Sequence, residues 1–160
     1  MSARLEPDYF EGLYARDIDP WSFATSAYER DKYEQTLAAL EGRRFPTALE
    51  AGCSIGVFTE MLAPDCGRLL AVDASEQALG AARERLARCE NVQLERRVLP
   101  EELPLGPFDL VVCAELLYYW DEQLLLRALP ALEAAVAPGG SLLAVHWRPR
   151  TETYLSLIHI

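Results

Sequence analysis

Two glycines in a short loop and one carboxylate beyond it have a spacing that could bind a nucleotide-like ligand. The loop Glu50–Gly56 holds Gly52 and Gly56 between an apolar run and residues with helix spacing. A residue without a Cβ lets the chain turn sharply and lets a ligand lie against backbone amides. Asp73, about 20 residues further on, ends the apolar run Arg68–Asp73, where it could accept hydrogen bonds from both ribose hydroxyls.

Each of these features alone has a simpler explanation. A Gly-x-x-x-Gly loop also occurs as plain turn chemistry, and Asp73 could merely cap the next helix, although Ser75 is present for that role. In a βαβ unit, however, the loop and the carboxylate lie at the same edge of the sheet. Their joint occurrence therefore favours a cofactor with a nucleoside part.

Later strands bring further side chains to that edge. The run Phe108–Ala114 is continuously apolar, as expected for the middle of a parallel sheet, and Ser141–Trp147 reads as another buried strand. Polar and aromatic residues follow or end these strands and should lie beside the loop: Glu115, Tyr118, Tyr119, His146, Trp147 and Arg148.

Helical and strand patterns alternate through residues 46–148. A helix pattern runs from Ser75 to about Cys89, Asn91–Val98 alternates as an edge strand does, and Ala137–Gly140 reads as a turn. Pro130 either kinks the helix that precedes this turn or starts a second one. The order predicts an α/β fold with a doubly wound, mostly parallel sheet.

Residues 1–45 form an N-terminal helical lead-in, which we interpret as a cap segment. Seven of the chain's fifteen aromatic residues precede residue 34, and an amphipathic helix is expected from Ser22 to Leu40. Most of these aromatic side chains should pack on the sheet edge. Trp21 lies in a turn, and it or Tyr14 is a candidate to contact the ligand.

The composition limits the partners. A formal charge of −10 and a pI near 4.7 argue against binding to nucleic acid and favour a small-molecule partner. No apolar run approaches the ~20 residues of a membrane span and no leader pattern is present, so we expect a soluble, cytoplasmic protein without a membrane partner. The four scattered cysteines suggest neither a metal site nor disulfides. The oligomeric state is not readable.

Four motifs in this order resemble the class I S-adenosylmethionine-dependent methyltransferases over residues 46–148. They are Glu50-x-Gly-x-Ser-x-Gly56, Asp73 at the end of the second strand, Phe108-Asp-Leu-Val-Val112 and Ala137-Pro-Gly-Gly140. Four further segments resemble the nodulation protein S group: Tyr9–Trp21, Ser54–Gly56, Leu117–Tyr119 and His146–Arg148. The resemblance implies a Rossmann-like methyltransferase fold, S-adenosylmethionine as cofactor, and N-methylation of an amino sugar on a chitin-type oligosaccharide.

The resemblance also assigns roles in cofactor binding. It gives Glu50, Gly52 and Gly56 to the methionine end and Asp73 to the ribose. The full set expected to contact the cofactor is Trp21, Glu50, Gly52, Cys53, Ser54, Gly56, Asp73, Ala74, Val98 and Glu115. Many members place an acid beside adenine where this chain has Arg-Val-Leu at 97–99, which leaves adenine to backbone groups and apolar side chains. Ser54 replaces the middle glycine of the loop.

Methyl transfer from a sulfonium needs an aligned nucleophile and removal of its proton, with the acceptor amine kept neutral. Glu115, Asp121 and His146 could accept that proton. An imidazole titrates at about 6.5 without tuning, whereas Glu115 needs a pKa raised by burial or would instead hold an ammonium. We predict Glu115 and His146 as catalytic residues, and Tyr118, Tyr119, Trp147 and Arg148 as substrate contacts.

Two other hypotheses compete with the methyltransferase. A nicotinamide-dependent oxidoreductase would also use Asp73, but its fingerprint requires glycine where this chain has Ser54 and Val57. Only a short tail, 149–160, follows the fifth strand, so the methyltransferase fold is apparently truncated there and that strand should sit on an exposed edge. A truncated, non-catalytic cofactor-binding fragment is therefore the third hypothesis.

Overall fold

The structure, a computed structural model, describes residues 4–147. Its centre is one five-stranded sheet with strand order β3-β2-β1-β4-β5, and every neighbouring pair of strands is parallel. The sheet is therefore more regular than the mostly parallel one that the sequence predicts. The strands are β1 (Phe45–Ala51), β2 (Cys66–Asp73), β3 (Val92–Arg96), β4 (Phe108–Ala114) and β5 (Val136–Val145).

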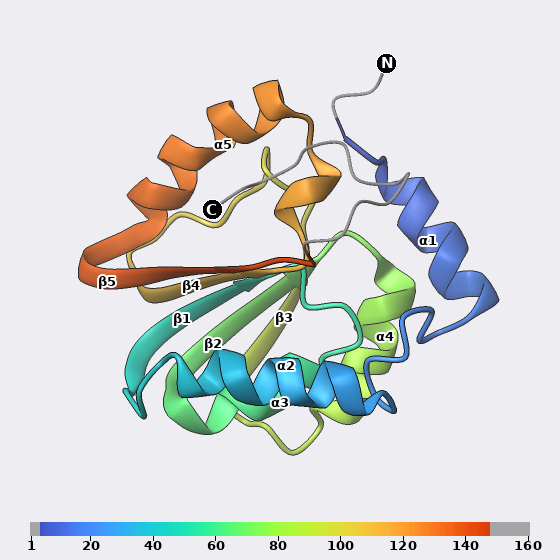
Figure 1. The fold of residues 1–160 in the computed structure, drawn as a ribbon, viewed down its shortest axis with the longest axis horizontal. Coiled ribbons are helices and arrows are strands. Elements are labelled where there is room, and N and C mark those ends of the chain that lie inside the picture. The colour runs from blue at the N-terminus through green and yellow to red at the C-terminus, as the bar shows by residue number, and fades with distance from the viewer. Residues whose placement is uncertain (1–3, 148–160) are drawn as a thin grey trace.

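Helices cover both faces of the sheet, which confirms the doubly wound prediction (Figure 1). One face carries α2, α3 and α4, and the other carries α5, while α1 stands on the side to which the strand arrows point. The helices are α1 (Pro7–Arg16), α2 (Ala27–Ala38), α3 (Val57–Leu62), α4 (Glu76–Arg85) and α5 (Glu122–Ala135), with short 3-10 turns η1 (Ala63–Asp65) and η2 (Leu117–Tyr119).

The strand order puts a switch point between β1 and β4. From β1 the chain moves outward through β2 to β3, and then returns to the other side of β1 with β4. The loops that follow β1 and β4 thus leave the sheet in opposite directions and open a crevice between them. Ala51 is in register with both Val72 and Cys113, so the loops after β1, β2 and β4 start at the same level.

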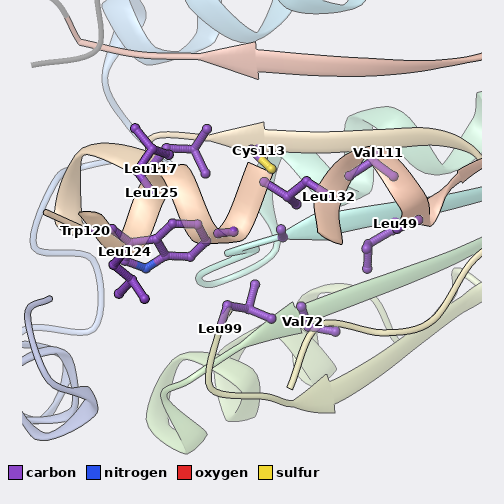
Figure 2. Close-up of a cluster of buried hydrophobic side chains, with 13 residues drawn as sticks. Leu49, Val72, Leu99, Val111, Cys113, Leu117, Trp120, Leu124, Leu125 and Leu132 are labelled. Atoms are coloured by element: carbon purple, nitrogen blue, oxygen red, sulfur yellow. The ribbon is translucent and has the colours of Figure 1, made fainter. Parts of the chain in front are cut away.

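Alternate residues of the strands face the two helical layers. On one face Leu49, Val72, Val111 and Cys113 pack against α5, as Figure 2 shows with Leu132 lying over them. On the other face, apolar residues of β1, β2 and β4 contact α2 and α3: Ala48, Leu69, Leu110 and Val112 against Tyr33, Phe58 and Leu62. Glu50 follows the parity of Ala48, so its carboxyl group enters the second layer.

The predicted N-terminal helix is shorter than expected. We predicted it from Ser22 to Leu40, but α2 begins at Ala27 because Ser26 caps it by accepting a hydrogen bond from the Glu29 amide (3.4 Å). Ser22 itself adopts a left-handed φ of 58° in the preceding turn.

The predicted turn at Ala137–Gly140 lies within the bounds of β5 as an irregular stretch, in which Gly139 has a left-handed φ of 78°. A register shift beside Phe108 and Leu110 absorbs the irregular stretch, and a Cβ on Gly140 would lie 2.9 Å from the Asp109 carbonyl oxygen. Glycine here lets β5 approach β4 closely.

Pro130 does not end its helix, and the predicted edge strand is present. Pro130 lies within a continuous α5, at an exposed position of the helix. The strand predicted at Asn91–Val98 is β3, and it lies at the sheet edge as expected. Among residues 4–147, none of the helices has the length and hydropathy that crossing a bilayer requires.

Candidate cofactor and active site

The loop between β1 and α3 turns through three left-handed residues. Gly52, Ser54 and Gly56 have φ values of 80°, 51° and 78°. The amides of Gly52 and Cys53 both donate to the Val72 carbonyl oxygen, at 2.8 and 2.9 Å. The loop is therefore fixed to the end of β2 before any ligand binds.

Asp73 joins the loop from the other side. Its Oδ2 accepts a hydrogen bond from the Ser54 amide at 2.8 Å, and its Oδ1 accepts one from the Ser75 amide at 2.9 Å. Burial raises the pKa of Asp73, while the amides of Ser75, Ser54 and Ala74 oppose that shift. The glycine loop and the carboxylate thus share one crevice, as the sequence predicts.

Glu50 is a buried carboxyl group without a partner for one of its oxygens. The residue is 2% exposed, and its Oε2 has no hydrogen-bond partner in the part of the chain that the structure describes. Burial raises the pKa of Glu50 to about 8; the Thr59 hydroxyl opposes the shift and the Asp73 carboxylate adds to it. A buried acceptor beside a cleft suits a cationic ligand group.

The two loop glycines have different structural roles. Gly52 lines the cleft, and a Cβ there would lie 3.4 Å from Leu116 Cδ1. Gly56 lies outside the cleft-lining residues and faces α4, where a Cβ would lie 2.9 Å from Leu86 Cδ1 and 3.2 Å from Ala82 Cβ. Packing of α3 on α4 is therefore a sufficient reason for glycine at position 56.

A cavity of about 180 Å³ lies over this edge of the sheet. It brings together most residues that the sequence predicts for cofactor and substrate: Trp21, Glu50, Gly52, Cys53, Ser54, Asp73, Ala74, Val98, Glu115, Tyr118, Tyr119 and Trp147. Gly56 and His146 do not line it, and Arg148 lies outside the described residues.

Glu115 follows β4 with a left-handed φ of 53°, which is uncommon for a residue with a side chain. Both of its carboxylate oxygens are engaged. Lys32 Nζ binds Oε1 at 3.0 Å, while the Tyr118 hydroxyl and the Trp147 amide donate to Oε2 at 2.6 and 2.9 Å. This arrangement favours Glu115 as an ion partner and positioning group over a proton acceptor.

His146 follows β5 beside Tyr118, with 6.0 Å between the two ring centroids. Both imidazole nitrogens are buried and lack a hydrogen-bond partner within residues 4–147. Burial lowers the pKa of His146, and the Glu115 carboxylate opposes that shift. The imidazole is therefore neutral at pH 7, which is the form that accepts a proton.

The predicted adenine end of the cleft combines apolar and cationic residues. Val98 and Leu99 line it together with Arg97, whose guanidinium pairs with the Glu95 carboxylate at 2.6 Å. Residues 97–99 thus offer adenine no carboxylate, and the Arg97 guanidinium is already paired with Glu95.

The N-terminal segment contributes more than the sequence predicts. The Leu5 amide donates to the Tyr119 carbonyl oxygen at 3.1 Å, the Ser75 hydroxyl donates to the Glu11 carboxylate, and Arg4 contacts the Leu99 carbonyl oxygen at 3.1 Å. The dense aromatic content of residues 1–45 indicated contact with the core. Nothing in the local pattern distinguished Glu11 or Lys32 from solvent-exposed charges.

The nodulation protein S (NodS) of Bradyrhizobium japonicum WM9, an N-methyltransferase solved with S-adenosyl-L-homocysteine, superposes with a TM-score of 0.78 at 33% identity, covering 86% of this chain and 70% of that one. The fold is therefore the Rossmann-like fold of the class I methyltransferases.

The family model for nodulation protein S matches residues 8–149. This chain belongs to the nodulation protein S family. The protein of that name from Bradyrhizobium diazoefficiens is 39% identical over 129 residues, which are 79% of this chain and 58% of the relative. A ubiquinone biosynthesis O-methyltransferase from Bordetella avium is 34% identical over 148 residues, 86% of this chain and again 58% of the relative. The chain thus spans little more than half the length of these relatives.

Proposed function

We propose that this chain is the cofactor-binding part of an S-adenosylmethionine-dependent methyltransferase that acts on a small molecule. The observation that carries the proposal is the 2.8 Å hydrogen bond between the Ser54 amide and Asp73, since it joins the glycine loop to the carboxylate that we assign to the ribose. The relative crystallised with S-adenosyl-L-homocysteine supports the same cofactor.

The residues present fit this cofactor. The unpartnered Oε2 of Glu50 suits its amino group, and Asp73 suits the ribose hydroxyls. The amides of Gly52 and Cys53 are already bound to the Val72 carbonyl oxygen, so the missing side chain of Gly52 gives room to the methionine end rather than a hydrogen-bond donor. Ala74, Val98 and Leu99 supply apolar walls for adenine, and Trp21 closes the cleft from the N-terminal segment. When bound, the cofactor supplies a sulfonium methyl group that is already activated for transfer.

The protein's own task is to orient the acceptor and take its proton. We take His146 as the candidate proton acceptor, because its pKa is lowered and its nitrogens have no partner within residues 4–147, while both oxygens of Glu115 are engaged. His146 does not itself line the cavity; its ring lies 6.0 Å from that of Tyr118, which does. His146→Ala should slow turnover and leave cofactor binding intact. Full activity in both His146→Ala and Glu115→Gln would remove the base hypothesis.

We further propose that the acceptor atom is an amine nitrogen, such as that of an amino sugar on a chitin-type oligosaccharide. The family relationship supports this, and so do the carboxylates of Glu29 and Glu115 at the cleft, which favour a cationic acceptor over a neutral hydroxyl. Tyr119 and Trp147 could stack on sugar rings. The free cysteines suit a reducing compartment, and we place the reaction in the cytoplasm.

Ligand-dependent unfolding tests the cofactor. S-adenosyl-L-homocysteine should raise the melting temperature in a saturable way and NAD should not, because a ligand that binds only the folded state stabilises it by mass action. Stabilisation by NAD alone would support the oxidoreductase alternative. No stabilisation by either ligand would contradict the proposal.

Methyl transfer is then assayed with two acceptors, a partly deacetylated chitin oligosaccharide and a catechol. Transfer to the oligosaccharide amine is the expected outcome. Transfer only to the catechol hydroxyl would mean that the acceptor atom is an oxygen and not an amine nitrogen. Binding of S-adenosyl-L-homocysteine without transfer to either acceptor would favour the hypothesis of a non-catalytic fragment.

A further inference from the structure

Lys32 of α2 holds its ammonium group inside the cleft, between two carboxylates and three aromatic rings. Its Nζ lies 2.5 Å from Glu29 Oε2 and 3.0 Å from Glu115 Oε1. The ring centroid of Tyr33 is 5.4 Å away, and those of Phe23 and Tyr28 are each 6.0 Å away. We call the five surrounding residues the ammonium cage.

The cage is built as proteins build sites for alkylammonium ions. Aromatic faces attract a cation through the ring quadrupole, and carboxylates accept its N–H bonds. The side chains of Lys32, Glu29 and Glu115 are only 14%, 13% and 12% exposed, so the ammonium is largely removed from water. The cage therefore already binds one alkylammonium ion, which is covalently attached to the chain.

The cage opens on the same cleft as the cofactor residues. Phe23, Glu29, Lys32, Tyr33 and Glu115 line the cavity that Gly52 and Asp73 also line. Within the cage, Glu115 follows β4 on the far side of the switch-point crevice from Gly52, while Tyr33 packs on Phe58 of α3 with 5.2 Å between the ring centroids. An acceptor bound there would lie in the same cleft as the methyl donor.

We propose that the ammonium cage is the subsite for the amine end of the methyl acceptor, and that Lys32 fills this subsite until the acceptor displaces it. The acceptor class is a primary or partly methylated alkylamine, which enters as its ammonium ion before it loses a proton. The inference rests on the proposed methyltransferase function. Lys32 can leave the cage because its ammonium is a point charge on a flexible four-carbon stem, whereas the rings and carboxylates stay in place.

The test uses thermal unfolding with methylammonium chloride as the probe and sodium chloride at equal ionic strength as the reference. Lys32→Ala empties the cage and lowers the melting temperature, and methylammonium should restore it in a saturable way. A ligand with two non-hydrogen atoms cannot half-saturate much below about 10 mM, so the titration extends to several hundred millimolar. The wild type should respond no more than it does to sodium chloride.

Three variants sharpen the result. Lys32→Met keeps most of the stem and leaves the carboxylates without a cation, so its response should fall between those of the wild type and Lys32→Ala; it carries the test if Lys32→Ala does not fold. Adding Glu115→Gln to either variant should remove the response. Arg83→Ala, which breaks the exposed Arg83–Glu76 pair on α4, should gain none.

Equal responses of the wild type and both Lys32 variants would overturn the inference, as would a response that survives Glu115→Gln. The outcome is independent of the cofactor proposal, because stabilisation by S-adenosyl-L-homocysteine is measured separately on the wild type. If the Lys32 variants do not respond to methylammonium, the methyltransferase proposal still stands. If they respond but S-adenosyl-L-homocysteine does not stabilise the wild type, the methyltransferase proposal fails and the cage remains an alkylammonium site.

Discussion

Tyr14 on α1 and Ser54 in the loop after β1 share a hydrogen bond, with 2.6 Å between their hydroxyl oxygens. Ser54 has a φ of 51°, which is strained for a residue with a side chain. Its hydroxyl ties the loop to α1. The N-terminal segment and the cofactor loop are thus connected directly.

This bond predicts energetic coupling between the two residues. Tyr14→Phe and Ser54→Ala should each lower the free energy of unfolding by about 1 kcal/mol, since each leaves the other hydroxyl without its partner. The double variant should cost about 1 kcal/mol less than the sum of the two. Urea unfolding of all four proteins measures this, with Tyr9→Phe, exposed on the same helix, as the uncoupled control. Additive costs would mean that the bond contributes nothing.

Asp73→Ala should weaken binding of S-adenosyl-L-homocysteine by about 1–3 kcal/mol, because the ribose hydroxyls lose their acceptor and the Ser54 amide is released. Asp109→Ala is the matched control. Asp109 also accepts from a backbone amide, that of Thr47 at 2.9 Å, but it lies near the start of β4, at the other end of the sheet. Calorimetry should show unchanged affinity for the Asp109 variant, and unchanged affinity for the Asp73 variant would contradict the ribose assignment.

Gly56→Ala should destabilise the fold by about 1–3 kcal/mol, because the new Cβ would crowd Leu86 and Ala82 in a left-handed conformation. Gly80→Ala, inside α4 with no atom within 4 Å of its Cβ, should instead stabilise by about 0.5–1 kcal/mol. Urea denaturation compares them. If Gly56 contacts the cofactor as the sequence suggests, affinity for S-adenosyl-L-homocysteine will also fall under conditions where the variant is folded.

Glu50 should make the free energy of unfolding fall as the pH rises. The folded-state pKa is raised to about 8, so between the ordinary value of 4.5 and about 8 the folded protein holds a proton that the unfolded chain has lost. Stability due to this group therefore falls as pH rises through that window, by a few kcal/mol in order of magnitude.

Glu50→Gln should remove that fall. Urea unfolding at pH 5, 7 and 9 measures the difference between wild type and variant, in which contributions from groups that do not interact with Glu50 cancel. Glu60→Gln, on the exposed side of α3, serves as the control. Parallel pH profiles for the wild type and Glu50→Gln would show that Glu50 titrates normally.

Two local patterns needed the packed structure for their interpretation. Ala137–Gly140 has the composition of a turn and lies within β5 as an irregular stretch opposite Asp109, between the pairs Phe108–Val136 and Leu110–Ser141. Gly56 has the spacing of a ligand-binding glycine, and the packed structure adds a second reason for glycine there, because a Cβ would crowd Leu86 and Ala82.

The sequence by itself determined the layered parallel sheet and the meeting of Gly52 with Asp73. Strand and helix periods repeat locally, and the carboxyl ends of parallel strands must meet at one edge, so these features follow from pattern and connectivity alone. Only the tertiary structure decided which charged residues of the lead-in reach that edge. Lys32 and Glu115 are 83 positions apart, and Tyr14 and Ser54 are 40 apart. Such contacts depend on how the N-terminal helices pack over the sheet, and the raised pKa of Glu50 likewise depends on burial, which no local pattern records.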